Sequence, residues 1–394
     1  MKLSVVYSPN DYTSICTLED IPAGLVVDVN QIYADLARSL GLFKHVATLK
    51  KLFSLRIRGS LSQEKTLGGS LAIELVNNVE SSSVCQLQAK SLECGSVLFD
   101  TQEMPEECIM RPHSKDLALA LLFGSDAPEY EQSIGFNQHL CAQVVGASLA
   151  RELLAALGIR IVSCISGINQ VRKESLLSAE HLLSCNPLDI EEDEICCPFE
   201  ALRQSLLDAY TQAREACIPL CGQLSIAIEG LPLGLGLHAE SSSLSALVAQ
   251  ALFSLPECRQ MSFGTLDAFA ENRCDERSCS DFCLSYANNY LGGLEGGIAS
   301  GDPFILHAYF VPHANASAAP FNLKTLTSSS VPAASKDSHE LFFLRFMAES
   351  KLALALANLI QDHYGHCSLD ELLQRRKHEE EQCKRRLLCN SWVD

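Results

Sequence analysis

The most apolar part of the chain covers residues 137–157, where Ala, Val and Leu surround the whole helical circumference. A helix that is apolar on every side is buried within a domain, so we expect a central helix here. Gly158 follows it, in the position where a glycine commonly ends a helix. Residues 341–363 form a second strongly apolar stretch and predict a second long helix.

Shorter patterns predict the other elements. Alternating or continuous apolar runs of strand length indicate strands at 3–7, 55–57, 71–76, 159–163, 223–229 and 304–311. Helical periodicity predicts helices over 29–53, with a break at Gly41, over 198–216 and over 243–255. The acidic stretch 190–197 is predicted to be an exposed link, 313–338 a long loop, and 369–392 a charged helix. Strands and helices do not alternate regularly, so the pattern favours the α+β class.

Composition agrees with a folded globular protein. The chain has 394 residues, of which 47% are hydrophobic and 20% charged. No apolar run approaches the roughly 20 residues that span a bilayer, and the first residues do not resemble a signal peptide. We therefore expect a cytoplasmic protein without a membrane partner.

The cysteines and the net charge exclude several kinds of site. Eighteen cysteines without an export signal are expected to be reduced thiols that pack as small hydrophobic groups. None shows the paired C-x2-C spacing of a zinc site, so no metal site is predicted. The formal net charge of −18 makes nucleic acid and anionic membranes poor partners.

A glycine-rich run, NNYLGGLEGGIASG, occupies residues 288–301. It holds two Gly-Gly pairs, and its spacing matches neither a dinucleotide-binding loop nor a phosphate-binding P-loop. Glycine permits tight turns and also lets a ligand approach the backbone. Both interpretations remain open: a turn between packed strands, or a binding loop.

The same run resembles the segment SNHAGGILGGISSG of chorismate synthases. Three further segments resemble that family in the same order along the chain: 21–25 (IPAGL), 145–161 (VGASLARELLAALGIRI) and 222–235 (GQLSIAIEGLPLGL). The ordered matches run from near residue 20 to near residue 363. The resemblance implies a sandwich of helices between β-sheets, formed by a domain over 1–366, and a homotetramer. Residues 367–394 would be a charged helical extension beyond the family's usual end.

Chorismate synthases convert 5-enolpyruvylshikimate 3-phosphate to chorismate and phosphate with reduced FMN, in the shikimate pathway of aromatic amino acid biosynthesis. The resemblance places two of the family's histidines at Asn10 and Tyr290. Asparagine cannot act as a general acid near neutral pH. His339 matches another family histidine and is the candidate catalytic residue. The two arginines of the family's RSSARET motif are absent from 133–139 (SIGFNQH).

The resemblance also implies binding residues. Those for FMN are Asn289, Gly292, Gly293, Gly296, Gly297, Ser300 and Gly301. Those for the substrate and its phosphate are Arg38, Lys50, Lys51, Arg111 and Arg345. Glu295 and Asp302 add negative charge to the glycine run, which disfavours a phosphate there.

Two functions follow, and whether the protein is an enzyme stays open. In the first, the protein has lost or strongly altered the family reaction and is an oligomeric binding or scaffold protein, a tetramer or dimer without FMN. The charged helix over 369–392 would then offer a surface to a protein partner. In the alternative, it is an active chorismate synthase, a carbon-oxygen lyase that uses FMN.

Overall fold

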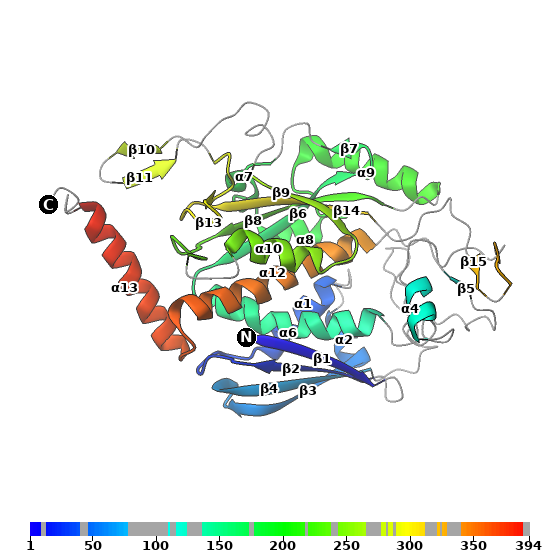
Figure 1. The fold of residues 1–394 in the computed structure, drawn as a ribbon, viewed down its shortest axis with the longest axis horizontal. Coiled ribbons are helices and arrows are strands. Elements are labelled where there is room, and N and C mark those ends of the chain that lie inside the picture. The colour runs from blue at the N-terminus through cyan, green and yellow to red at the C-terminus, as the bar shows by residue number, and fades with distance from the viewer. Residues whose placement is uncertain are drawn as a thin grey trace.

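The computed structural model describes residues 1–8, 13–39, 46–77, 109–110, 116–123, 136–172, 177–216, 220–237, 243–264, 277–280, 283–286, 289–311, 321–323, 325–328 and 340–388. These residues form a sandwich in which long helices lie between two antiparallel sheets (Figure 1). The predicted α+β class and sandwich architecture are therefore confirmed.

The first sheet has four strands in the order β1-β2-β4-β3. Their bounds are β1 (Lys2–Ser8), β2 (Thr13–Glu19), β3 (Phe53–Ser62) and β4 (Lys65–Asn77). In β2, Cys16 and Leu18 are fully buried whereas Ile15 and Glu19 are exposed. This alternation places one face of the sheet against the helices and the other toward solvent.

The central strands of the second sheet are buried on both faces. Its strands, in the order β7-β6-β8-β14-β9, are β7 (Val171–Arg172), β6 (Arg160–Ile168), β8 (Gly222–Glu229), β14 (Phe304–Phe310) and β9 (Cys258–Phe263). Every residue of β8 except Glu229 is buried, because helices cover the sheet on both sides. The continuous apolar runs that predicted β8 and β14 reflect this double burial.

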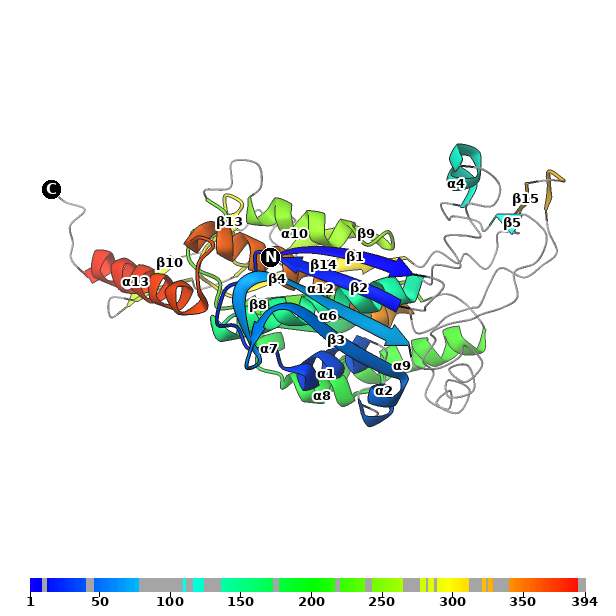
Figure 2. The same ribbon diagram turned by 90° about the horizontal axis from the view of Figure 1, so that it is seen from below.

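Two long helices form the central layer, as predicted. Helix α6 (Phe136–Ala156) packs on the first sheet, and α12 (Glu340–Tyr364) packs on α6 and on β6 and β8 (Figures 1 and 2). Helix α1 (Val29–Ser39) lies against both of them. Gly158 ends α6 with a φ of 70°, a backbone conformation that glycine adopts without strain.

Shorter elements complete the described structure. The helices are α2 (Val46–Leu52), α4 (Asp116–Phe123), α7 (Ala179–Leu183), α8 (Pro187–Glu192), α9 (Glu200–Glu215), α10 (Leu244–Phe253) and α13 (Leu369–Leu388). The strands are β5 (Ile109–Met110), β10 (Arg277–Ser280), β11 (Cys283–Tyr286), β12 (Leu294–Glu295), β13 (Ile298–Ala299), β15 (Phe321–Asn322) and β16 (Thr327–Ser328).

One sequence prediction is wrong in a way that matters for the site. Residues 190–197 are not an exposed link, because Ile190, Ile195 and Cys197 are buried in the core. The acidic residues of this stretch flank α8, and Glu191 points into the protein. Because a run rich in Glu and Asp is typical of an exposed segment, the sequence pattern did not indicate that its apolar residues are buried.

Two boundaries also differ from the prediction. The stretch 29–53 holds two helices, α1 and α2, which agrees with the predicted break, but Phe53 already begins β3 instead of ending the second helix. Strands β3 and β4 are longer than predicted because polar side chains cover their outward face. They are joined at Gln63 and Glu64, whose φ values of 48° and 62° are typical of a tight hairpin turn.

Helix α13 extends away from the body of the protein (Figure 1). Its first turns are anchored: Leu372 is fully buried, and Arg376 donates hydrogen bonds to the carbonyl oxygens of Leu157 and Gly230. The domain boundary at 366/367 stays a prediction. No helix in the described ranges is long and apolar enough to cross a membrane.

A polar row crosses the buried second sheet. Ser225 Oγ donates to Ser166 Oγ at 2.7 Å and lies 2.8 Å from His307 Nδ1. Because the single hydroxyl proton of Ser225 is used toward Ser166, Nδ1 of His307 carries the proton and donates to Ser225. The imidazole is fully buried, and burial lowers the pKa of His307 to about 4.

This histidine predicts an acid-sensitive fold. The unfolded chain binds a proton at His307 near pH 6.5, whereas the folded chain binds it near pH 4. Between these values the unfolded state holds more protons, so stability falls as pH falls, by up to ~3 kcal/mol. We expect His307→Gln to flatten this part of the profile, measured by urea unfolding between about pH 7 and about pH 4.5. The exposed His378→Gln should keep the wild-type slope; equal slopes in all three proteins would contradict the assignment.

Candidate functional site

Residues 289–301 form a compact loop and turn that we call the glycine hairpin. Strands β12 and β13 pair with each other, and Gly296 and Gly297 link them with φ values of 60° and 88°. Two successive residues with positive φ are typical of the tightest hairpin turn, which favours glycine at both positions. The predicted turn between paired strands is confirmed for this pair of glycines.

The other glycine pair lets backbone segments touch. A Cβ atom on Gly292 would lie 2.6 Å from the carbonyl oxygen of Ile305, and one on Gly293 would lie 2.8 Å from that of Pro303. Asn289 fixes the same loop, since its Oδ1 accepts from the Gly293 amide and its Nδ2 donates to the Pro303 carbonyl, both at 2.6 Å. These positions are therefore filled by the chain's own backbone. A ligand-binding role for them stays a prediction.

The glycine hairpin meets the loop that follows β8. The Gly234 amide donates to the Ala299 carbonyl at 2.8 Å, and the Ala299 amide donates to the Leu235 carbonyl at 3.1 Å. Gly297 also accepts from the Ser245 amide at the start of α10. Two of the glycine-containing segments singled out in the sequence are thus adjacent in space.

A side-chain hydrogen bond closes the end of the glycine hairpin. Ser300 Oγ donates to Asp302 Oδ2 at 3.3 Å, and Gly301 has a φ of 90°. Tyr290 is half-buried, while Glu295 is exposed at the turn. Negative charge therefore lies at this loop, as the sequence indicated.

The candidate substrate residues fall into three groups. Arg38 on α1 and Arg345 on α12 come together, whereas Lys50 and Lys51 are exposed on α2. Figure 2 shows α1, the helix that carries Arg38, and β13 of the glycine hairpin on opposite sides of the central helices. Asn10, Arg111 and His339 lie outside the described residues.

Arg38 and Arg345 share one buried carboxylate. Glu191 Oε1 lies 2.6 Å from Arg38 Nη2, and its Oε2 lies 2.7 Å from Arg345 Nη2. Glu349 contacts the same two arginines, at 3.5 Å and 3.4 Å. These are charge-assisted contacts of the kind that an arginine would make to a phosphate.

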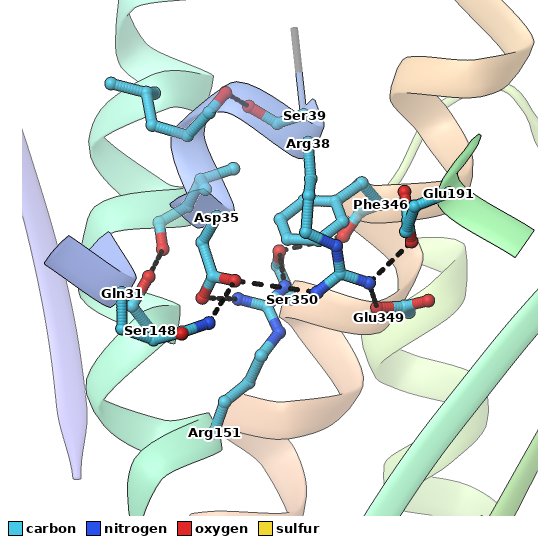
Figure 3. A network of polar contacts seen from close by, with 12 residues as sticks. Gln31, Asp35, Arg38, Ser39, Ser148, Arg151, Glu191, Phe346, Glu349 and Ser350 are labelled. Carbon is cyan, nitrogen blue, oxygen red and sulfur yellow. Dashed lines mark hydrogen bonds and ion pairs between the residues drawn. The ribbon is translucent and has the colours of Figure 1, made fainter. Parts of the chain in front are cut away.

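A third arginine completes what we call the core ion-pair cluster, namely Asp35, Arg38, Arg151, Glu191, Arg345 and Glu349. Arg151 Nη1 lies 3.1 Å from Asp35 Oδ2, and Arg38 and Arg151 both stack on Phe346 (Figure 3). With three arginines and three carboxylates, the cluster is electrically balanced. It joins α1, α6, α8 and α12, which explains how so many charges can be buried together.

The pKa values follow this pairing. Burial alone would raise the pKa of Glu191, but the charges of Arg345 and Arg38 outweigh it and lower the pKa to about 2. Burial would likewise lower the pKa of Arg345, but Glu191 raises it above its usual range. Glu191 and Arg345 are therefore both charged at neutral pH.

The sequence interpretation did not identify Asp35, Arg151, Glu191 or Glu349. Two signals could have found part of the cluster: Asp35 and Arg38 are spaced i,i+3, and Arg345 and Glu349 are spaced i,i+4, both favourable pair spacings on a helix. Glu191 is distant in sequence from both arginines and gives no such signal.

In this arrangement neither the candidate substrate ligands Arg38 and Arg345 nor the candidate FMN positions Gly292 and Gly293 are open to a phosphate. The terminal nitrogens of Arg38 and Arg345 face carboxylates, which repel a phosphate. The backbone at Gly292 and Gly293 leaves no open cradle, because their missing side chains are replaced by neighbouring main chain. Nor does the described part of the chain bring together three His, Cys, Asp or Glu side chains that could hold a metal ion.

Comparisons with known proteins agree on one family. The family model for chorismate synthase matches residues 11–360. The chorismate synthase of Rubrobacter xylanophilus is 24% identical over 375 residues, covering 92% of each chain, and that of Leifsonia xyli is 26% identical over 368 residues, covering 91% of this chain and 90% of the relative. A crystal structure of chorismate synthase aligns with a TM-score of 0.71 at 19% identity, covering 97% of this chain and 98% of the other.

The shared carboxylate predicts a large effect of one substitution. Glu191→Gln leaves Arg38 and Arg345 with too little negative charge in a buried place, and we expect it to lower the free energy of unfolding by about 3–5 kcal/mol. Urea denaturation at neutral pH measures this loss. Glu192→Gln, at the exposed neighbouring position of α8, should change stability by less than about 0.5 kcal/mol. Similar small effects of both substitutions would show that the carboxylate is not needed to balance the arginines.

Proposed function

The chain belongs to the chorismate synthase family, and from this premise we propose that it keeps the family fold while lacking or strongly altering the family reaction. In this proposal it is a cytoplasmic, oligomeric binding or scaffold protein, a tetramer or a dimer. The family's reaction needs cations that hold a phosphorylated substrate and the phosphate of FMN.

The internal pairing of Arg38 and Arg345 carries this proposal. Both are candidate phosphate ligands, and Glu191 contacts both at 2.6–2.7 Å. A phosphate would have to displace this carboxylate or share the arginines with it. The replacement of family histidines by Asn10 and Tyr290 supports the same conclusion, because asparagine cannot act as a general acid near neutral pH and a tyrosine does not reproduce the titration of a histidine.

Helix α13 supports the binding part of the proposal. It extends from the body, and Lys384 and Arg385 near its end are exposed, as is Glu381. A protein partner with complementary charges would find these side chains accessible.

A second candidate function is an active chorismate synthase, a carbon-oxygen lyase of aromatic amino acid biosynthesis. Two observations favour it: the family model matches 11–360, and Nε of both Arg38 and Arg345 is buried without a hydrogen-bond partner. This function would need α8 to carry Glu191 away, so that the arginines could bind an anion. His339, Arg111, Lys50 and Lys51 would then complete the site.

Titration with FMN separates the two functions. We expect calorimetry to detect no FMN binding, because neighbouring main chain fills the space beside Gly292 and Gly293. Adding 5-enolpyruvylshikimate 3-phosphate should not change this, because the candidate ligands of its phosphate are already paired. The purified protein should elute as an oligomer in gel filtration with light scattering. The chorismate synthase of Thermotoga maritima, 21% identical over 391 residues, is a matched positive control.

Micromolar FMN binding that tightens with the substrate, followed by chorismate formation under reducing, oxygen-free conditions, would refute the proposal in favour of the enzyme. A monomer that binds no FMN would refute the oligomeric part alone.

A further inference from the structure

A second site lies between the edge strand β1 and the central helices. A pocket of about 330 Å³ is lined by Leu3 and Val5 of β1, Gln143 of α6, and Lys351 and Leu354 of α12. None of these residues belongs to the glycine hairpin or to the core ion-pair cluster. Occupation of the pocket is therefore independent of whether the family reaction survives.

The pocket lies where β1 packs on α6. Leu3 lies directly over Gly146, where a Cβ atom would come within 2.5 Å of the leucine Cδ1. Gln143, about one turn earlier in α6, lines the pocket together with Leu3. Since β1 is the outer strand of its sheet, no further strand closes this side among the described residues.

Lys351 brings an unpaired charge to the pocket. It is half-buried, and its ammonium forms no ion pair or hydrogen bond with any described residue. By contrast, the three arginines of the core ion-pair cluster each contact a carboxylate. Burial lowers the pKa of Lys351, the expected result for a cation without a counter-charge. An anion bound in the pocket would supply the counter-charge and so stabilise the charged form of Lys351.

Gln143 adds a second unsatisfied group. Its Oε1 is buried and has no hydrogen-bond partner. Buried polar atoms are nearly always paired, so a missing partner is an observation in itself. The pocket thus offers one cation, one free hydrogen-bond acceptor and three aliphatic side chains. Polar groups and aliphatic side chains both line the pocket, and its volume lies at the lower end of the usual range for small-molecule sites.

We propose that this pocket binds a medium-chain aliphatic carboxylate that carries a hydroxyl group. The carboxylate pairs with Lys351, the hydroxyl donates to Gln143 Oε1, and the chain lies against Leu3, Val5 and Leu354. The ligand thus supplies a counter-charge for the ammonium, a hydrogen-bond donor for the free acceptor and an apolar chain for the aliphatic side chains. A phosphate would not use the aliphatic walls, and a fatty alcohol would not use the charge.

The test is calorimetry of the full-length protein with 3-hydroxyoctanoate, compared with octanoate and octanol. We expect submillimolar binding of the hydroxy acid, weaker binding of octanoate and none of octanol. Lys351→Met should weaken the hydroxy acid by at least about tenfold, since it removes a charge-assisted contact while keeping the volume of the side chain. Gln143→Leu should abolish the preference for the hydroxy acid over octanoate.

Two further variants keep the result interpretable. Lys351→Arg retains the charge and should retain binding, which guards against a Lys351→Met protein that fails to fold. Lys377→Met, on the exposed face of α13, should bind like the wild type. Absence of binding to the wild type, equal binding of octanol, or undiminished binding to a folded Lys351→Met variant would each overturn the proposal.

Discussion

The central helices of this protein pack around a buried ion-pair cluster, which is stable only when every charge in it has a partner of opposite sign. Three arginines and three carboxylates meet where α1, α6, α8 and α12 converge, and Phe346 stacks on two of the guanidinium groups. Buried ion pairs add little net stability compared with apolar residues of the same volume, but the loss of one partner is strongly destabilising. The cluster therefore acts less as a source of stability than as a condition on how the four helices can pack.

This condition gives α8 an importance out of proportion to its length. Alone, a helix of this size is too short to be stable. It is fixed by Ile190 in the apolar core and by Glu191 between two arginines. A segment held by both kinds of contact can move only if both are broken together, which ties the availability of Arg38 and Arg345 to the packing of α8.

The sequence predicted the parts of the fold that rest on local pattern. Helices α6 and α12 and strand β8 were found because their burial makes them continuously apolar, and the turn at Gly296 was found because its backbone favours glycine. The core position of α8 could not be found in the same way. Its acidic residues are typical of a solvated link, and only contacts with residues over 150 positions away explain why one of them, Glu191, is buried. The same limit applies to Arg38 and Arg345. Their match to the family's phosphate ligands could not predict that Glu191, which is distant in sequence, pairs with both of them.

Competition between Glu191 and an external anion can be judged by its magnitude. A group tethered in the same chain acts at an effective concentration on the order of millimolar or above, before any preorganisation is counted. A free ligand at micromolar concentration must therefore bind the arginines at least about a thousandfold more tightly than Glu191 does. A phosphate dianion gains from its extra charge and its third oxygen, but it also meets the remaining charge of Glu349 and Asp35. The family's reaction depends on several cations that act together on the substrate. Two arginines already neutralised by carboxylates produce only a weak positive potential that could attract it. The fold that holds these arginines is nevertheless retained.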